Sequence, residues 1–244
     1  MGHCLMMRKG EVHTAPVTGV LASSLAVGST VKLMEGGTSV DYLVVNQGIP
    51  SNSNLYDSSC DGTWLLRKDI HSNRQWATSN VNKYESSAIN TWLNGDYFSS
   101  LGTVEQASIK QVKIPYRKDG GEGGTDQSGA DGLLCKVFLL GGYELGWTTS
   151  DYSYFPVDGA KLSYFESGTG TSANNKRIAN LNGSGAYWRL RSPRTYDTNY
   201  VWGVGSNGSY GSGSASSSSG IRPALVLPSN ALFDEATKLL KGVK

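Results

Sequence analysis

The sequence predicts a single α+β domain built from short, twisted antiparallel sheets, two helices and long loops. The expected helices and strands are short and mixed along the chain, and long polar loops separate them. The 31 glycines among 244 residues indicate many turns rather than long helices. A hydrophobic share of 38% is low but adequate for one core, and no tandem repeat of the solenoid type occurs.

In the first half of the chain, an arm or attachment segment over residues 1–26 is expected to precede three strands and two helices. Strands are predicted at residues 30–34, 40–46 and 63–67, the first two around a Gly36-Gly37 turn. Apolar side chains at positions 88, 89, 92 and 93 share a helical face. They predict a helix over residues 84–93 that ends at Asn94-Gly95. Thr103 to Gln106 has the form of a capping box and predicts a second short helix.

The second half is predicted to be richer in loops. Residues 112–114 read as a strand, residues 118–132 as a Gly-rich surface loop, and the hydrophobic stretch 133–140 as a central strand. A turn or short helix is expected at 141–145 and another short helix near 158–166. Further strands are predicted at 187–191, 200–204 and 221–227, before a C-terminal tail over 229–244 with weak helical character at 233–240.

Charge and hydrophobicity argue against nucleic-acid binding and against insertion into a membrane. The formal net charge is +2 and no basic run occurs, which argues against a nucleic-acid-binding protein. No apolar run approaches the roughly 20 residues that a membrane-spanning helix needs. The stretch 17–27 follows Arg8 and Lys9 but is too polar for a convincing signal peptide.

The sequence offers little catalytic or metal-binding chemistry. Cys4, Cys60 and Cys135 lack a CxxC spacing, which excludes a dense disulfide framework and a zinc ribbon but leaves a Cys60–Cys135 bridge open. Of three histidines, His71 alone lies outside the expected arm, and no nucleophile elbow accompanies it. We therefore expect no catalytic residue, no metal and no cofactor. A calcium site remains a weak alternative for the loop residues Asp57, Asp61, Asp126 and Asp131.

Tryptophans and arginines on predicted elements allow a structural or a functional interpretation. Four tryptophans could line a sugar-binding groove, but their place in predicted strands and helices favours the core: Trp64, Trp92, Trp147 and Trp188. Three arginines lie on strands, and buried arginine needs a partner. For Arg67, Arg191 and Arg222 the candidate partners are Glu144, Asp69 and Glu85.

The most unusual segment runs from Arg194 to Ser219. Half of its residues are Gly or Ser, and it contains no Lys, Glu, Gln or Met. Such a composition is typical of a flexible linker, yet two firm motifs flank the segment, at residues 188–193 and 220–227. Tyr, Ser, Gly and Asn are also the residues of antibody paratopes, where tyrosine supplies rigid contact area.

The two flanking motifs, W-x-LRSP and GxRPAL, resemble those of a bacterial and phage domain family that includes gut members. Residues 64–67, 89–94 and 137–140 also fit, so the resemblance covers roughly residues 27–228. Members of this group look like the variable proteins of diversity-generating retroelements, which have a C-type-lectin-like fold. One departure is Arg189, where many such proteins have an aromatic residue.

The resemblance implies a mechanism for the biased composition. In these systems a reverse transcriptase miscopies template adenines, and the altered copy replaces the downstream part of the target gene. Asn codons of the AAY type then become NNY, which never encodes Lys, Gln, Glu, Met or Trp. The segment from Arg194 to Ser219 obeys this restriction everywhere except at Trp202, which would be an invariant anchor.

The resemblance also implies a division of roles within a ligand-binding domain over 27–228, whose variable region is about 188–222. Four residues are expected to be structural anchors: Trp188, Arg191, Trp202 and Arg222. The expected ligand-binding surface consists of Arg194, Tyr196, Asp197, Asn199, Tyr200, Gly203, Gly205, Tyr210, Gly211, Ser212, Gly213, Ser214, Ser216, Ser217 and Ser218.

These expectations describe a non-enzymatic binding protein on a phage tail or cell surface. Its partner would be a protein or glycan on a host or target cell, and it could form homo-oligomers or join a tail complex. One alternative is an enzyme related to the formylglycine-generating branch of the same fold, but the C-terminal half lacks the cysteine pair this needs. The other is a carbohydrate-binding module of fixed specificity that uses tryptophans and calcium.

Overall fold

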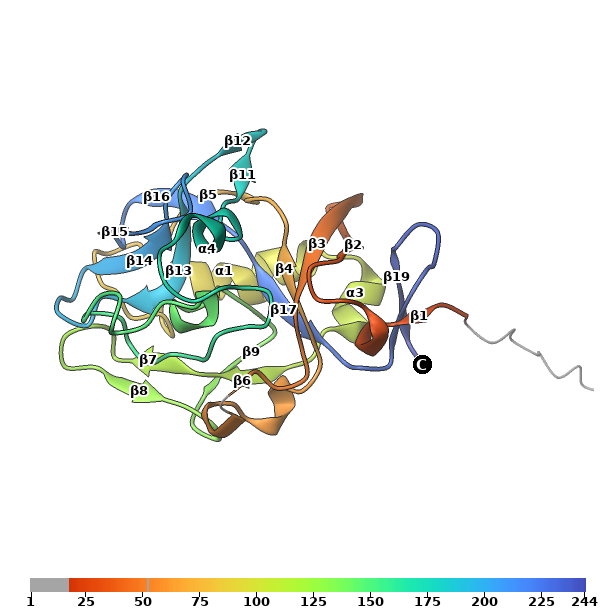
Figure 1. Ribbon diagram of the computed structural model, residues 1–244, viewed down its shortest axis with the longest axis horizontal. Helices are drawn as coiled ribbons and strands as arrows, with labels where there is room; N and C mark the ends of the chain where they lie inside the picture. Colours follow the sequence, from red (N-terminus) through yellow and green to blue (C-terminus); the bar gives the residue numbers. More distant parts are fainter. Residues whose placement is uncertain (1–17, 52) are drawn as a thin grey trace, which may run out of the picture.

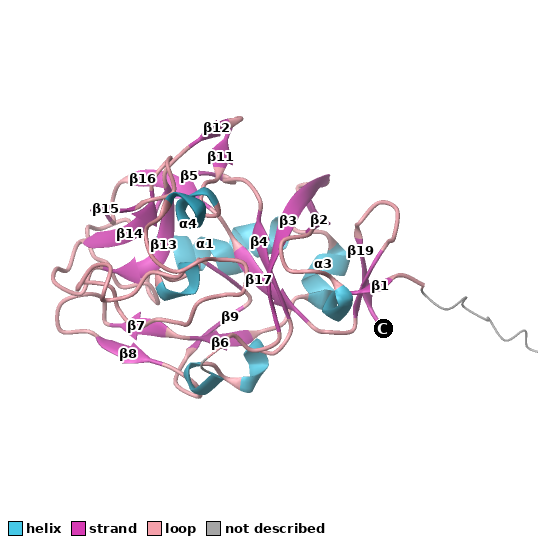
Figure 2. Ribbon diagram, viewed as in Figure 1, coloured by secondary structure: helices cyan, strands magenta, loops and turns pink. Residues whose placement is uncertain are grey.

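Small sheets dominate the computed structural model, which describes residues 18–51 and 53–244 (Figures 1 and 2). Among these described residues, strands account for 36% and helices for 16%. Two five-stranded sheets form the body, and shorter strand pairs and helices surround them. The α+β class with short antiparallel sheets is therefore confirmed.

The first five-stranded sheet forms the centre of the core. Its strands are antiparallel and lie in the order β10 (Val137–Phe138), β17 (Ala224–Leu227), β4 (Thr63–Arg67), β3 (Thr38–Gln47) and β2 (Thr30–Glu35). The sequence predicted β2, β3 and β4 correctly. The stretch 133–140 is not a central strand, because it divides into β9 (Leu133–Cys135) and β10, and β10 lies at the edge of the sheet.

The second five-stranded sheet carries most of the segment from Arg194 to Ser219. Its order is β15 (Tyr210–Ser214), β14 (Tyr200–Val204), β13 (Trp188–Pro193), β16 (Ser218–Ile221) and β5 (Ser72–Gln75). Only β13 and β16 are parallel. The single strand predicted over 221–227 is wrong, because Arg222-Pro223 separates β16 in this sheet from β17 in the other. Proline has no backbone N–H for a ladder, so the chain changes sheets there.

The predicted helix over 84–93 exists in part. Helix α1 (Ala88–Trp92) begins later, after Ser87, whose hydroxyl accepts a hydrogen bond from the Asn90 N–H. The predicted end at Asn94-Gly95 is wrong, because a π-helical turn, η4 (Leu93–Tyr97), continues into α2 (Phe98–Ser100). The Asn94 amide instead holds β10: its oxygen accepts from the Lys136 and Val137 N–H groups, and its Nδ2 donates to the Val137 carbonyl.

The second predicted helix, α3 (Thr103–Ser108), is present but is capped differently. Its N-cap is Gly102, and Thr103 is the first helical residue. The buried Glu105 carboxylate accepts a hydrogen bond from the Met34 N–H on β2. This helix is therefore fixed to the first sheet by a side chain that the capping-box pattern did not use.

The remaining elements are short. The paired strands are β6 (Val112–Ile114) with β9, β7 (Tyr116–Lys118) with β8 (Thr125–Gln127), and β11 (Asn180–Leu181) with β12 (Ser184–Gly185). The 3₁₀ turns are η1 (Ala22–Ser24), η2 (Ser53–Leu55), η3 (Ser58–Cys60) and η5 (Tyr143–Leu145). The helix expected near 158–166 is absent from that described stretch, which holds the buried Asp158 in an extended loop, and α4 (Thr171–Asn175) follows instead.

The two ends of the described chain form a three-stranded sheet. Strand β18 (Ala231–Phe233) lies between β1 (Val20–Leu21) and β19 (Leu240–Val243). The part of the expected arm that the structure describes is thus paired with the tail, and residues 1–17 lie outside the described residues. The weak helix expected at 233–240 is wrong, because this segment is the turn of a β-hairpin.

Aromatic side chains fill the core. Trp64, Trp147 and Trp188 are fully buried, so the core interpretation is confirmed for these three. Trp92 is half-buried, with the Arg74 guanidinium 3.9 Å from its ring centroid. No helix in residues 18–51 and 53–244 has the length and apolar character to cross a membrane.

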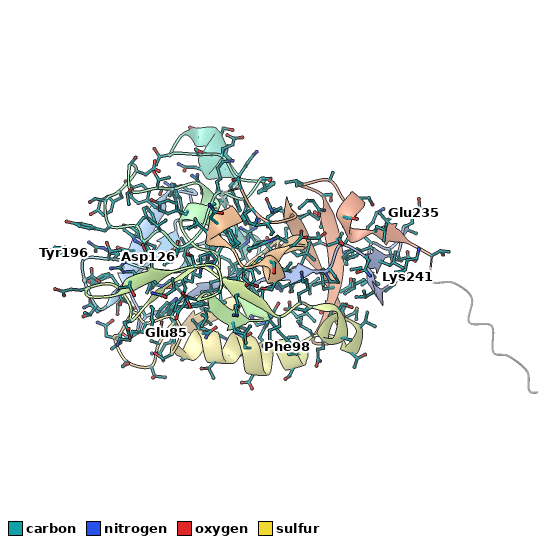
Figure 3. All side chains as sticks on the ribbon, turned by 90° about the horizontal axis from the view of Figure 1, so that it is seen from below. Glu85, Phe98, Asp126, Tyr196, Glu235 and Lys241 are labelled. Carbon is teal, nitrogen blue, oxygen red and sulfur yellow. The ribbon has the colours of Figure 1, made fainter. Side chains whose placement is uncertain are left out.

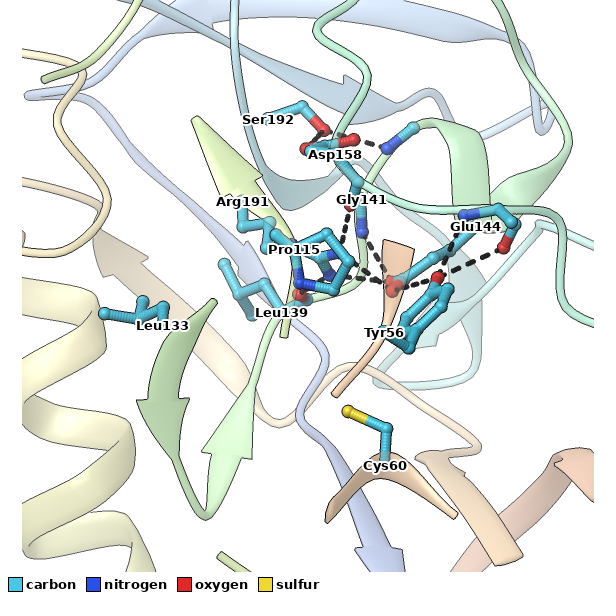
Figure 4. A network of polar contacts seen from close by, with 12 residues as sticks. Tyr56, Cys60, Pro115, Leu133, Leu139, Gly141, Glu144, Asp158, Arg191 and Ser192 are labelled. Atoms are coloured by element: carbon cyan, nitrogen blue, oxygen red, sulfur yellow. Dashed lines mark hydrogen bonds and ion pairs between the residues drawn. The ribbon is translucent and has the colours of Figure 1, made fainter. Parts of the chain in front are cut away.

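A buried ion pair between Arg191 and Glu144 connects β13 to the adjoining loops (Figure 4). Arg191 Nη1 and Nη2 lie 2.7 and 2.8 Å from the two Glu144 oxygens, and neither side chain reaches solvent. Arg191 also donates to the carbonyls of Pro115, Leu139 and Asp158. The Glu144 carboxylate accepts from the Tyr56 hydroxyl and the Gly141 N–H. Glu144, one of the three acids named as candidates, is therefore the partner of Arg191.

The other two arginines have different partners from those expected. Arg67 Nε lies 3.1 Å from Glu35 Oε2. With Asp69, one of the expected partners, Arg67 makes a hydrogen bond to the backbone carbonyl rather than to the carboxylate. Arg222 donates to the Arg67 carbonyl and lies over the Trp188 ring, 5.0 Å from its centroid. Glu85 accepts from the Asp119 N–H rather than from an arginine.

The cysteines of the described residues are not bridged. Cys60 and Cys135 are free and buried, and burial raises the pKa of the Cys60 thiol to about 12. A thiol with so high a pKa stays protonated and inert at neutral pH. The Cys60–Cys135 bridge that the sequence left open is therefore not formed.

Removing one partner of the buried ion pair is expected to destabilise the fold strongly. Arg191→Met leaves the Glu144 carboxylate buried without its guanidinium, which should lower the free energy of unfolding by about 3–5 kcal/mol. The half-exposed Lys32–Asp41 pair, at 2.9 Å, is a control, and Lys32→Ala should cost less than about 1 kcal/mol. Urea denaturation measures both. Equal losses in the two variants would contradict a special role for the Arg191–Glu144 pair.

Asp158 predicts a dependence of stability on pH. Burial raises the pKa of its carboxyl to about 7 from 3.8, although Arg191 acts in the opposite direction. The folded state thus holds this proton more tightly than the unfolded chain, so the contribution of Asp158 to stability falls as pH rises from 3.8 to about 7. Asp158→Asn removes the titration. The difference in unfolding free energy, variant minus wild type, should grow with pH across this window, and a constant difference would contradict the assignment.

Candidate functional site

The segment from Arg194 to Ser219 folds into a hairpin whose two faces differ. Strands β14 and β15 pair antiparallel, and side chains alternate between the faces. Tyr200 and Trp202 share one face with Tyr210 from the partner strand, whereas Gly203 and Gly211 share the other. The hairpin lies at the end of the molecule opposite the C-terminal strands, as Tyr196 and Lys241 show in Figure 3.

Five tyrosines on or beside the buried Trp202 form what we call the tyrosine patch: Tyr152, Tyr154, Tyr196, Tyr200 and Tyr210. Tyr152 and Tyr210 contact the Trp202 ring, Tyr154 contacts Tyr152 and Tyr196, and Tyr200 joins the patch through Arg194. Ring centroids are 4.9 Å apart for Tyr154 and Tyr196, and 5.2 Å apart for Tyr152 and Trp202. Below them Phe155 stacks on Trp202 at 4.3 Å. Tyr196 is 66% exposed, Tyr200 39% and Tyr152 37%, while Trp202 is 3% exposed. The patch is therefore an exposed aromatic surface on a buried aromatic floor.

Two members of the tyrosine patch were missed by the sequence analysis. Tyr152 and Tyr154 belong to the loop at 147–155, far from the hairpin in sequence. The Trp202 indole N–H donates to the Tyr154 carbonyl over 3.1 Å and ties the loop to β14. The Tyr-Ser-Tyr-Phe run at 152–155 was a compositional signal, because it repeats the tyrosine and serine content of the hairpin.

Arg194 lies within the patch. Its guanidinium carbon is 5.5 Å from the Tyr200 centroid, 5.7 Å from Trp202 and 5.8 Å from Tyr154. Arg194 Nε is 3.5 Å from Asp197 Oδ2, an ion-pair distance without hydrogen-bond geometry. Asp197 Oδ1 accepts from the Tyr200 N–H at 2.8 Å, which fixes the turn between Arg194 and β14.

Asn82 holds the same turn and was also missed by the sequence analysis. Its Nδ2 donates to the carbonyls of Asp197 and Tyr200, each over 2.9 Å, and its Oδ1 accepts from the Gly121 N–H. Asn82 is buried, so these bonds exclude water. One asparagine amide therefore joins three loops beneath the patch, and nothing in its sequence neighbourhood indicated this role.

The opposite face of the hairpin is a floor of glycines beneath Arg189. Arg189 Nη1 and Nη2 donate to the carbonyls of Gly213 and Ser214 over 2.8 and 2.7 Å. A Cβ on Gly213 would lie 2.9 Å from the guanidinium. Arg189 is 1% exposed, and burial lowers the pKa of its guanidinium. The missing side chain thus makes room for this arginine.

The four expected anchors are buried, whereas the expected contact residues range from exposed to buried. Trp188, Arg191, Trp202 and Arg222 are all buried. The exposed contact residues are Tyr196, Tyr200, Ser212, Ser217 and Ser218, and the half-buried ones are Arg194, Asp197, Asn199, Gly205, Tyr210, Gly211, Gly213, Ser214 and Ser216. Gly203 is buried, and a Cβ there would lie 2.2 Å from the Tyr187 hydroxyl oxygen. Its assignment to the contact surface is wrong.

From Ser214, the cross-strand partner of Tyr200, the serines at the end of the segment run towards β5. Ser218 pairs with Gln75 of β5, and the Gln75 amide donates to the Ser216 carbonyl over 2.9 Å. Ser214 donates to Asn80 Oδ1 over 2.6 Å. The structure therefore brings the aromatic and charged contact residues together with Ser214, whereas Ser216 and Ser218 lie next to β5.

His71 takes part in a separate polar cluster. Its Nδ1 lies 2.7 Å from Ser72 Oγ, and its Nε2 lies 3.5 Å from Glu35 Oε1. Burial lowers the pKa of its imidazole. Arg67 and the hydroxyls of Tyr42 and Tyr97 all donate to Glu35. The Glu35 carboxylate therefore contacts four polar side chains, an arrangement that indicates a structural role.

Gly203 and Ser212 should respond differently to substitution. Gly203→Ser places atoms against the Tyr187 hydroxyl and the Trp188 carbonyl, and such overpacking should lower the free energy of unfolding by about 1–3 kcal/mol. Ser212→Ala removes only an exposed hydroxyl and should change it by less than about 0.5 kcal/mol. Thermal and urea denaturation of both variants test this. A Gly203→Ser protein as stable as wild type would contradict the close packing.

Comparison with known proteins gives a family without a described activity. A family model described as a domain of unknown function (DUF6273) matches residues 61–229. The matched region runs from just before β4 to just after β17 and includes the whole second five-stranded sheet with the hairpin. No curated protein and no solved structure matches the chain. Because the model matches well over half of its length, the chain belongs to the family described as a domain of unknown function, DUF6273.

Proposed function

We propose that this protein is a non-enzymatic binding protein whose tyrosine patch recognises a ligand on a host or target cell. The observation that carries the proposal is the patch itself, in which exposed tyrosines gather beside the buried Trp202 and one of them, Tyr152, packs against its ring. Contiguous exposed aromatic surface on a folded domain marks an interaction site. Tyrosine, tryptophan and arginine are also the residues that contribute most to binding at interfaces.

The support beneath the patch favours binding without large rearrangement. Trp202 is fixed by its stack on Phe155 and by its hydrogen bond to the Tyr154 carbonyl. Asn82 and the Asp197 carboxylate fix the turn that carries Tyr196. Rigid presentation lowers the entropy that binding removes, so a small patch can retain useful affinity.

We further propose that retroelement diversification generates this surface and that the domain is a C-type-lectin-like fold displayed on a phage tail or cell surface. The hairpin supports the first part through its unequal tolerance of side chains. Tyr196, Tyr200 and Ser212 are exposed, so other side chains can replace theirs. Gly203 and Gly208 cannot change freely, since a Cβ on Gly208 would lie 1.9 Å from the Asn174 carbonyl oxygen.

Sequencing of the gene's neighbourhood and of sibling loci tests the proposal. We expect a reverse-transcriptase gene and a near-identical template repeat. Variation among siblings should fall on codons that contain adenine in the template repeat and encode exposed positions such as 196, 200 and 212. The codons for Gly203, Gly208 and Trp202 should stay constant because their packing admits no change. A locus with no reverse transcriptase and no repeat, and an invariant hairpin among siblings, would refute retroelement diversification.

A further inference from the structure

We infer that the tyrosine patch binds a carboxylated glycan, with Arg194 holding the sugar carboxylate. The inference rests on the proposed function and assigns a ligand class to the same surface. Arg194 carries it, because an arginine inside an aromatic cluster has donors that the protein itself does not use.

The Arg194 guanidinium lacks hydrogen bonds to the described part of the chain. Its Nε is buried without a hydrogen-bond partner, and Asp197 Oδ2, at 3.5 Å, lies outside hydrogen-bond geometry. An unsatisfied buried donor is costly, more so when it is charged. Arg191 makes the contrast, since its three nitrogens donate to a carboxylate and three carbonyls. Nε is enclosed, so a ligand would meet the two terminal nitrogens of Arg194, which are not buried and make no hydrogen bond to a described residue.

Asp197 Oδ2, at 3.5 Å, offsets part of the Arg194 charge but accepts no hydrogen bond from it, so the donors of Arg194 remain available. Its Oδ1 accepts from the Tyr200 and Asn199 N–H groups and thereby closes the turn. The Arg194 side chain remains 21% exposed, so a ligand can reach it. A carboxylate can accept two parallel hydrogen bonds from a guanidinium, which adds geometric specificity to the charge attraction.

The hydroxyls of the patch point to the same ligand chemistry. Those of Tyr152, Tyr154, Tyr196 and Tyr200 bond to no other described residue, whereas in the core Tyr42, Tyr56 and Tyr84 all use theirs. Free phenol hydroxyls and a free guanidinium make the patch rich in donors. An acceptor-rich ligand with apolar ring faces, such as a sugar acid, complements both the donors and the aromatic faces.

The size of the patch favours a glycan over a protein. The patch consists of a few rings: Tyr152, Tyr154, Tyr196, Tyr210 and Trp202 form one connected cluster with neighbouring centroids 4.9–6.0 Å apart, and Tyr200 adjoins it through Arg194. A stable protein interface buries about 800 Å² on each partner and involves about 20–30 residues. A few sugar rings match a cluster of this extent, and one arginine matches one carboxylate.

An array of oligosaccharides that end in hexuronic or nonulosonic acids, each paired with its methyl ester, tests the inference. The full chain should bind at least one carboxylated glycan, and esterification should weaken binding about tenfold or more, because it removes a charge-assisted hydrogen-bond acceptor. Arg194→Gln should cause the same loss without lowering the melting temperature, and Arg194→Lys should restore only part of the binding. Arg74→Gln, a matched control outside the patch, should bind like wild type.

Different failures have different meanings. Equal binding of acids and esters, full binding by Arg194→Gln, no bound carboxylated glycan, or equal binding of an immobilised poly-glutamate peptide would each overturn the inference. The double variant Tyr196→Ser/Tyr200→Ser separates this from the proposed function. If wild type binds acids and esters equally and the double variant loses both, the patch is the binding site but is not selective for acids. If the double variant binds like wild type, the patch is not the binding site and the proposed function fails with the inference.

Discussion

The structure depends most on the buried ion pair between Arg191 and Glu144. Two charges removed from water are tolerated only when nearly every donor and acceptor around them is satisfied. Here the remaining partners come from separate segments, so the electrostatic requirement also fixes the positions of those segments. The loop that supplies Tyr152 and Tyr154 begins shortly after Glu144 and ends before Asp158. Arg191 donates hydrogen bonds at both ends of this loop, to the Glu144 carboxylate and to the Asp158 carbonyl. The pair therefore closes the base of the loop from which the tyrosine patch is partly built.

The sequence predicted those features that local chemistry determines. Strands β2, β3 and β4 follow from runs of β-branched and aromatic side chains. The need of a buried arginine for an acid indicated that strand arginines have acidic partners, but did not assign Glu144 to Arg191. Prediction from the sequence failed where a distant partner decides the outcome. Asn94-Gly95 has the composition of a helix end, yet the Asn94 amide bonds to β10 and the helix continues. The strand at 221–227 divides because each half finds a different sheet.

The candidate site was predictable to a similar degree. Composition located Arg194, Tyr196 and Tyr200, because a biased segment between firm motifs is visible in a single sequence. Composition could not show that Gly203 is buried, because its burial depends on the Tyr187 side chain, whose hydroxyl end lies against Gly203. It also could not place Tyr152 beside Trp202, a contact between segments about fifty residues apart. The faces of a hairpin become distinct only when its neighbours are in place.

The hairpin is held through its main chain. Arg189 bonds to the carbonyls of Gly213 and Ser214, and Asn82 bonds to those of Asp197 and Tyr200. Every residue has the same main-chain carbonyl, so these hydrogen bonds do not depend on which side chains occupy positions 214 and 200. Exposed residues of the hairpin can therefore be substituted without weakening these main-chain hydrogen bonds. The fold and the chemistry of its surface can then be inherited separately.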